Sequence, residues 1–221
     1  MRAVYLIAPM PEVQSHGFSF EEWVRNEFFD GYTGSYMQKW DIAPSHNRSE
    51  SVPAEFRHLP VSIKTAKLGA PIGLGDALRQ RKIDHSFLMI VGFWRQKTPR
   101  EKWITEIDFT IFTPESWEQL WGGLDLDPLE EIDQMVKNRA EHYSVVRKKA
   151  KAWKAQPNVR SSPIVINPKI DSKTQRRVQC SLPASAFWRL ATQDASSGGE
   201  VCLWGKPFPN PILSSPRVFN K

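Results

Sequence analysis

The sequence predicts an α/β protein in which a central mixed β-sheet is flanked by α-helices. Three observations support this fold class. Residues 19–29 place apolar side chains on one face at helical spacing, residues 85–94 form the short apolar run of a strand buried on both faces, and residues 103–112 alternate as a strand does. After residue 113 the chain is mostly helical, so the order is one helix, several strands and then further helices.

Local signals define the individual elements. Ser19 and Glu22 have the spacing of a capping box, which predicts that the first helix starts at Ser19. Thr113 and Pro114 are typical of an N-cap and a first helical position. The expected helices are residues 19–29, 74–83, 113–124, 128–155 and 183–192. The expected strands are residues 36–43, 59–67, 85–94, 103–112, 163–167 and 178–182.

The chain has 221 residues, 40% of them hydrophobic, which is enough for one domain with a substantial core. Because no repeat or linker divides it, we expect a single domain over residues 1–221. Cys180 and Cys202 lack the spacing of a zinc site and favour a reducing compartment over a disulfide scaffold. The apolar run near the N-terminus is too short for a signal sequence or a membrane span, so we expect a cytoplasmic protein without membrane contact.

The charge of the chain is concentrated in one segment. The formal net charge is +6, and residues 147–177 contain ten Lys or Arg residues and one acidic residue, a charge of +9 that leaves −3 for the rest. A basic stretch of this kind makes nucleic acid the leading class of partner. The alternative is a basic face that contacts only solvent.

An aspartate and a lysine are the first candidates for chemistry. Asp41 lies in KWDIA and Lys64 in VSIKTAK, and the two side chains face the same cleft if these segments are neighbouring strands. Phosphodiester hydrolysis needs a nucleophilic water and neutralisation of charge on the scissile phosphate. A divalent metal held by carboxylates supplies Lewis acidity, and a lysine beside it orients or deprotonates the water. The simpler alternatives are a capping aspartate and a solvent-facing strand lysine.

The segments FEEWVRNEFFDGYTG, KWDIA, VSIKTAK and GDALRQ together resemble the active-site half of the PD-(D/E)XK nuclease superfamily, particularly its type II restriction endonucleases. The resemblance covers residues 18–95. It implies a restriction-endonuclease-like fold, with residues 1–112 as the catalytic core and residues 113–221 as a helical, DNA-contacting half that ends in an extended arm. In this resemblance Asp41 matches the family aspartate, Lys64 the lysine and Glu21 the helix glutamate.

Two positions depart from the family pattern. Trp40 precedes Asp41 where proline is usual, and Ser62 stands where the family usually has Glu or Asp. A neutral hydroxyl is a weaker ligand for Mg²⁺ than a carboxylate, and some restriction endonucleases with this serine take the missing carboxylate from a nearby helix. The candidates here are Glu21, Glu22, Glu27 and Asp76. Glu21 comes first because it borders the apolar stripe, and the backbone carbonyl of Ile63 is a further metal ligand.

The stretch KIDSKTQRR and the strand after it offer groups that suit DNA contact. Arginine pairs with guanine, glutamine with adenine, and lysine with phosphate. The segment is therefore expected to read base sequence, with phosphate contact alone or a solvated charged turn as alternatives. The candidate DNA-binding residues are Lys173, Gln175, Arg176, Arg177 and Gln179.

Together these observations predict a Mg²⁺-dependent endonuclease that cuts double-stranded DNA at a short specific sequence. Asp41 and Glu21 would hold the metal with the Ile63 carbonyl, Lys64 would position or activate the water, and Ser62 would replace the second acid. The family resemblance implies a homodimer, because a palindromic site mirrors a two-fold protein. The alternatives are a structure-specific repair or recombination nuclease of the same fold and a DNA-binding protein without catalysis.

Overall fold

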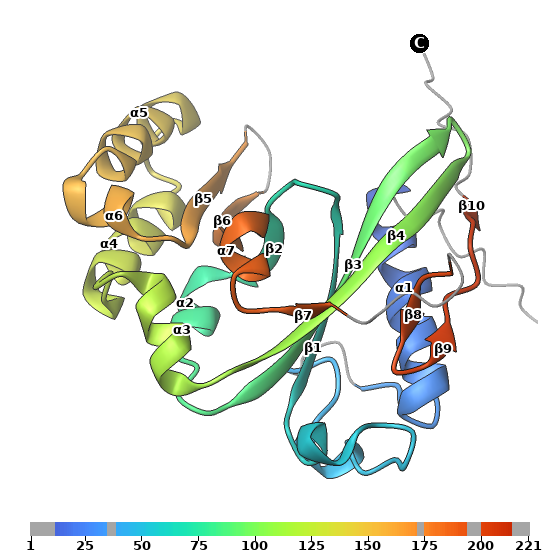
Figure 1. Ribbon diagram of the computed structural model, residues 1–221. Coiled ribbons are helices and arrows are strands. Elements are labelled where there is room, and N and C mark those ends of the chain that lie inside the picture. The colour runs from blue at the N-terminus through green and yellow to red at the C-terminus, as the bar shows by residue number, and fades with distance from the viewer. Residues whose placement is uncertain (1–11, 35–38, 172–174, 194–199, 214–221) are drawn as a thin grey trace, which may run out of the picture.

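The structure is a computed structural model that describes residues 12–34, 39–171, 175–193 and 200–213. The predicted DNA-binding residue Lys173 and part of the expected strand at 36–43 lie outside these ranges. The fold is mixed α/β, with a curled mixed sheet flanked by helices and a smaller antiparallel sheet beside it (Figure 1). Within the described ranges, no helix combines the length and the apolar character that crossing a bilayer requires.

The mixed sheet is built on three strands, β1 (Val61–Lys67), β3 (Phe87–Thr98) and β4 (Glu101–Phe112). β1 runs parallel to β3, and β3 forms a long antiparallel hairpin with β4. Two short strands, β7 (Thr192–Gln193) and β10 (Ile212–Leu213), pair antiparallel with different parts of β4. The central strand β3 is buried from Phe87 to Phe93, as its continuous apolar run predicts.

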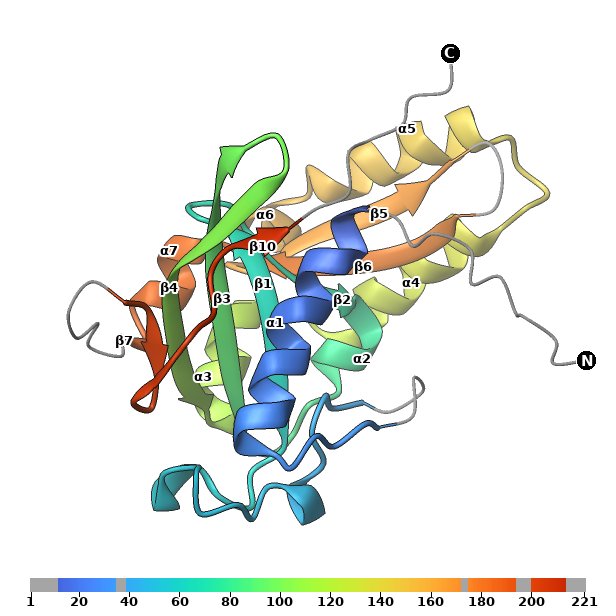
Figure 2. The ribbon, with the colours of Figure 1, turned by 90° about the vertical axis from the view of Figure 1, so that its right-hand side faces the viewer.

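Helix α1 (Glu12–Phe28) covers one face of the mixed sheet (Figure 2). Phe20, Val24 and Phe28 are buried in one apolar cluster with residues of β1 and β3. A Cβ atom at Gly92 of β3 would lie 2.8 Å from the Phe20 ring, so the absence of a side chain lets α1 approach the sheet. The helix begins before Ser19, and the predicted capping box is therefore wrong.

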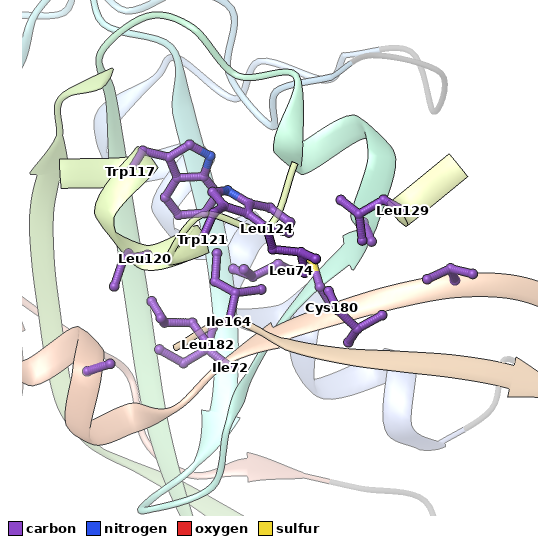
Figure 3. Close-up of a cluster of buried hydrophobic side chains, with 14 of the residues drawn as sticks. Ile72, Leu74, Trp117, Leu120, Trp121, Leu124, Leu129, Ile164, Cys180 and Leu182 are labelled. Carbon is purple, nitrogen blue, oxygen red and sulfur yellow. The ribbon is translucent and has the colours of Figure 1, made fainter. Parts of the chain in front are cut away.

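The smaller sheet is antiparallel, in the order β2 (Ile72–Asp76), β6 (Arg176–Leu182) and β5 (Val165–Ile170). Helices α4 (Leu126–Lys137) and α5 (Tyr143–Lys154) pack against β6 and β5. Figure 3 shows side chains of β2 and β6 meeting those of α3 (Pro114–Trp121) and α4 in a buried cluster. The labelled members are Ile72, Leu74, Trp117, Leu120, Trp121, Leu124, Leu129, Ile164, Cys180 and Leu182.

Short elements complete the fold. Thr113 and Pro114 start α3 as predicted, and the Thr113 side chain accepts a hydrogen bond from the Ser116 N–H. The other short helices and strands are α2 (Ala77–Arg81), α6 (Pro157–Ser161), α7 (Ala184–Trp188), β8 (Cys202–Leu203) and β9 (Lys206–Pro207).

Two sequence predictions are corrected by the second sheet and its helices. The helix expected at 74–83 is shorter, because residues 72–76 form a strand that pairs with distant β6, and this strand belongs to a second sheet that the sequence did not predict. The long helix predicted at 128–155 is two helices. Asn138 leaves the helical conformation, and its side chain accepts a hydrogen bond from the Ala140 N–H, so the chain turns between α4 and α5.

Asp108 of β4 is a carboxylate in the protein interior, with 1% of its surface exposed. Its Oδ2 accepts a hydrogen bond from Nε1 of Trp188 at 2.8 Å, which ties α7 to the sheet. Burial raises the pKa of the Asp108 carboxyl to about 6; the Trp188 hydrogen bond opposes the increase and the charge of Glu106 adds to it.

We expect Gly92→Ala to lower the free energy of unfolding by about 1–3 kcal/mol, because the added methyl group overlaps the fully buried Phe20 ring. Gly73→Ala on β2 is the matched control, since a Cβ there meets no atom within 4 Å, and its effect should stay within about 1 kcal/mol. Urea denaturation followed by circular dichroism measures both. Equal effects of the two substitutions would contradict the close approach of α1.

Asp108 also predicts a dependence of stability on pH. Since its folded pKa lies above the ordinary value, the folded protein binds more protons than the unfolded chain between pH 4 and 6, and the stability from this group is lost as pH rises through 6. Asp108→Asn keeps an acceptor for Trp188 without the buried charge. We expect a gain of about 1–3 kcal/mol at pH 8 and little change at pH 4.5 in urea denaturation. An equal gain at both pH values would show that the buried charge is not the cause.

Candidate active site

A cavity of about 420 Å³ opens beside β1, between α1, residues 39–41, β2 and α2. The four residues predicted to be catalytic all line it. They are Glu21, Asp41, Ser62 and Lys64. The fold therefore brings these four residues to one cavity.

Asp41 reaches β1 from a loop and not from the predicted strand, which the described residues show only as a single bridge. Ile42 pairs antiparallel with Val61 through two backbone hydrogen bonds, of 2.9 and 3.1 Å. This bridge sets the Asp41 carboxylate beside the next residues of β1. Its Oδ2 accepts the backbone N–H of Ile63 at 2.6 Å and lies 3.5 Å from Oγ of Ser62.

Lys64 lies with its ammonium group against Asp41. The distance from Nζ to Asp41 Oδ2 is 2.9 Å, and Nζ also donates to the backbone carbonyl of Ile63 at 3.0 Å. The side chains of Lys64 and Asp41 are 22% and 25% exposed, so the pair lines the cavity while remaining accessible to a ligand. The interpretation of Lys64 as a plain solvent-facing lysine does not fit this contact.

Glu21 extends from α1 toward the same cavity. Its Oε1 forms an ion pair of 2.5 Å with Arg25, and the Arg25 guanidinium also lies 3.5 Å from the backbone carbonyl oxygen of Asp41. Burial raises the pKa of the Glu21 carboxyl, and the negative charge of Asp41 raises it further, while the Arg25 and Lys64 cations lower it. Two carboxylates therefore repel each other across this cavity, an arrangement that a bound cation would relieve.

The other acidic candidates separate into two groups. Glu22 and Glu27 are exposed on α1 and do not line the cavity, and the Glu27 carboxylate lies 3.8 Å from Nζ of Lys206. Asp76 lines the cavity from the end of β2 and also caps α2, because its Oδ1 accepts the N–H of Arg79 at 2.8 Å. Glu21 and Asp76 are thus the candidates placed near Ser62.

Several cavity residues were not singled out from the sequence. Arg25, Lys39, Arg79 and Gln80 surround the acids and supply positive charge and amide donors. Only the Glu21–Arg25 spacing of four residues on a helix was a usable signal, since it places the two side chains on one face. Lys39 and Arg79 come close to these acids only because the chain folds, so no local sequence pattern indicated them.

The predicted DNA-binding residues occupy different sides of β6. Arg177 is exposed and Gln179 is half-buried, and both lie on the face turned away from α4. Arg176 lies on the helix side, where its guanidinium donates to the carbonyls of Val136, Asn138 and Glu141 over 3.3–3.4 Å. Gln175 is exposed just before the strand. Arg177 and Gln179 are therefore brought together, whereas Arg176 supports the turn after α4.

No protein-family model matches the chain, and neither a curated protein nor a solved structure is significantly similar to it. What the site can do is therefore inferred from its own residues. Within the described part of the chain, His, Cys, Asp and Glu side chains do not gather in a group of three or more that could hold a metal ion. The acids that line the cavity with Lys64 are Glu21, Asp41 and Asp76, and Lys64 is paired with Asp41.

The opposite placement of Arg176 and Arg177 gives a stability test. Arg176→Ala removes three hydrogen bonds to backbone carbonyls, and we expect it to lower the free energy of unfolding by about 1–3 kcal/mol. Arg177→Ala, its exposed neighbour, should change stability by no more than about 0.5 kcal/mol. Urea denaturation compares the two, and a larger effect of Arg177→Ala would contradict the assigned sides.

Proposed function

We propose that this protein is a Mg²⁺-dependent endonuclease of the PD-(D/E)XK type, with a restriction-endonuclease-like fold, that hydrolyses phosphodiester bonds of double-stranded DNA at a short specific sequence. One observation carries the proposal. Asp41 accepts both the Ile63 N–H and the Lys64 ammonium group, and the same cavity contains Glu21. This hydrolysis needs two carboxylates that can hold a metal ion, with a lysine beside them that can stabilise charge on the phosphate.

The donor atoms fit a hard divalent cation. Mg²⁺ prefers oxygen ligands, and it is commonly held by one or two carboxylates together with phosphates of the substrate. Asp41 and Glu21 provide carboxylates and Ile63 a backbone carbonyl, and the repulsion between the two acids favours a cation there. When bound, the ion would supply Lewis acidity toward the scissile phosphate. A pair of acids suffices because DNA supplies further oxygens.

Lys64 and Ser62 then take distinct roles. Lys64 would orient the attacking water and stabilise charge on the phosphate, because its ammonium group lines the cavity. It could activate the water by accepting a proton only in its neutral amine form. Ser62 brings a hydroxyl close to Asp41 where the family pattern has an acid. Glu21 from α1 replaces the carboxylate that Ser62 lacks.

A DNA-binding protein without catalysis is the second candidate, and one observation favours it. Of the three acids that line the cavity, Asp76 also caps α2, and Ser62 is neutral where the family pattern has an acid, which leaves fewer free anionic ligands than that pattern supplies. Such a protein would use cationic side chains of the cavity, among them Lys39 and Arg79, to bind DNA and leave it intact. The two candidates differ in one measurement, the cutting of DNA in the presence of Mg²⁺.

We expect purified protein with Mg²⁺ to convert a plasmid of known sequence into discrete fragments, and EDTA to prevent it. Lys64→Ala should slow cleavage by at least about 100-fold, because the variant loses the cation beside the scissile phosphate. Lys67→Ala is the matched control, since this exposed lysine lies on the same strand outside the cavity. Gel analysis of the fragments and sequencing of their ends give rate, specificity and cut position.

The outcomes separate the candidates. Intact plasmid at every Mg²⁺ concentration, together with DNA binding, would favour the protein without catalysis. Cleavage that is unchanged in Asp41→Ala or Lys64→Ala would place the active site elsewhere. Fragments without defined ends would point to the structure-specific nuclease.

A further inference from the structure

The β2–β6–β5 sheet has one open face. Along β5 and β6, alternate residues bury their side chains toward α4 and α5, and the residues between them lie on the opposite side. In the register of the sheet, Asn167 is opposite Gln179 and Lys169 is opposite Arg177. Within the described residues, this face carries amide, guanidinium and ammonium groups in two adjacent rows.

The central side chains of this face are available to a ligand. Gln179, Lys169 and Arg177 make no side-chain hydrogen bond or ion pair with any other described residue. Arg176, one residue away on the helix side, makes three hydrogen bonds to carbonyls. On β6, Arg176 is thus hydrogen-bonded on the packed side. On the open side Ser181 accepts a hydrogen bond from Asn167, whereas Arg177 and Gln179 make none with another described residue.

A glycine leaves part of the open face without a side chain. Gly73 of β2 pairs with Ser181, and a Cβ atom at Gly73 would meet nothing within 4 Å. Glycine within a strand often marks the close approach of a ligand. A hollow of about 380 Å³ lies here, lined by Gly73, Gly75, Asn167, Lys169, Gln179, Cys180 and Ser181.

This hollow adjoins the candidate active site. Gly75 lines both cavities, and Asp76, which lines the active-site cavity, is the register partner of Gln179. β6 residues before Gln179 pair with β5 alone, so the sheet narrows to a two-stranded ribbon away from the active site. Figure 2 shows β5 and β6 running side by side beyond β2.

We infer that the open face of the β2–β6–β5 sheet contacts the base edges of duplex DNA whose cleaved phosphate lies at Asp41 and Lys64. This inference rests on the proposed function for its choice of ligand. A two-stranded ribbon fits the major groove, glutamine and arginine suit adenine and guanine edges, and Lys169 suits a phosphate. Gln179 and Arg177 read bases, and Gly73 lets the duplex approach the sheet.

The test is selection from a pool of randomised duplexes in the Lys64→Ala background with Mg²⁺, followed by fluorescence anisotropy on the enriched sequence. We expect one short sequence to be enriched. Adding Gln179→Ala should relax the preference at one or two base positions and weaken binding about five- to a hundredfold. Gly73→Val should weaken binding to every duplex, because its side chain fills the hollow. Gln119→Ala, an exposed glutamine on α3, should change nothing.

Thermal unfolding by circular dichroism verifies that each variant is folded, and Gly73→Val is expected to remain so because its position is open. The inference is overturned if no sequence is enriched, or if Gln179→Ala and Gly73→Val keep the same sequence and affinity. Its failure differs from failure of the proposed function. Lys64-dependent cleavage with unaltered selection would retain the nuclease and reject the surface, and Gln179-dependent selection without cleavage would do the reverse.

Discussion

The candidate site depends on a single hydrogen bond, from the backbone N–H of Ile63 to the Asp41 carboxylate, at the edge of the mixed sheet. β1 is the first strand of that sheet; among the described residues, β3 pairs with it on one side and only the Ile42 bridge on the other. The N–H of Ile63 finds no strand partner within this part of the chain, and the Asp41 carboxylate satisfies it at 2.6 Å. The same oxygen holds the Lys64 ammonium group. One carboxylate thus closes the sheet edge and fixes the lysine, so the geometry of the site follows from the need to satisfy an edge strand.

Two glycines place the remaining parts around this edge by opposite means. Gly92 is buried and lets the Phe20 ring lie directly against β3, which determines how near α1 and therefore Glu21 come to Asp41. Gly73 is exposed and leaves the floor of the second sheet empty. A side chain at the first position would move the helix, whereas a side chain at the second would occupy only the surface hollow. The packing of α1 at Gly92 thus determines the separation of Glu21 and Asp41. The missing side chain at Gly73 leaves room for a ligand beside them.

Local signals made the strands β1, β3 and β4 and the helix α3 predictable, because apolar runs, alternation and an N-cap are encoded within a few residues. The cavity lined by Glu21, Asp41, Ser62 and Lys64 was also anticipated, through the family resemblance and not through periodicity. Strand β2 was missed because its partner β6 is about a hundred residues away in the sequence, and pairing over that distance leaves no local pattern. The sequence alone could not show which face of β6 carries Arg176 and which carries Arg177. That assignment needs the strand register, since a shift of one residue exchanges the two faces.

The charges that line the cavity have a consequence for the order of binding. Glu21, Asp41 and Asp76 stand among Arg25, Lys39, Lys64 and Arg79, so the lining is close to neutral. A metal ion arriving alone meets four cations, and a DNA phosphate arriving alone meets three carboxylates. In the proposed function, each ligand would neutralise the groups that repel the other, and binding of one would therefore favour binding of the other. Since coupling of this kind is reciprocal, the proposed site would hold Mg²⁺ weakly by itself and more tightly once a phosphate occupies the cavity.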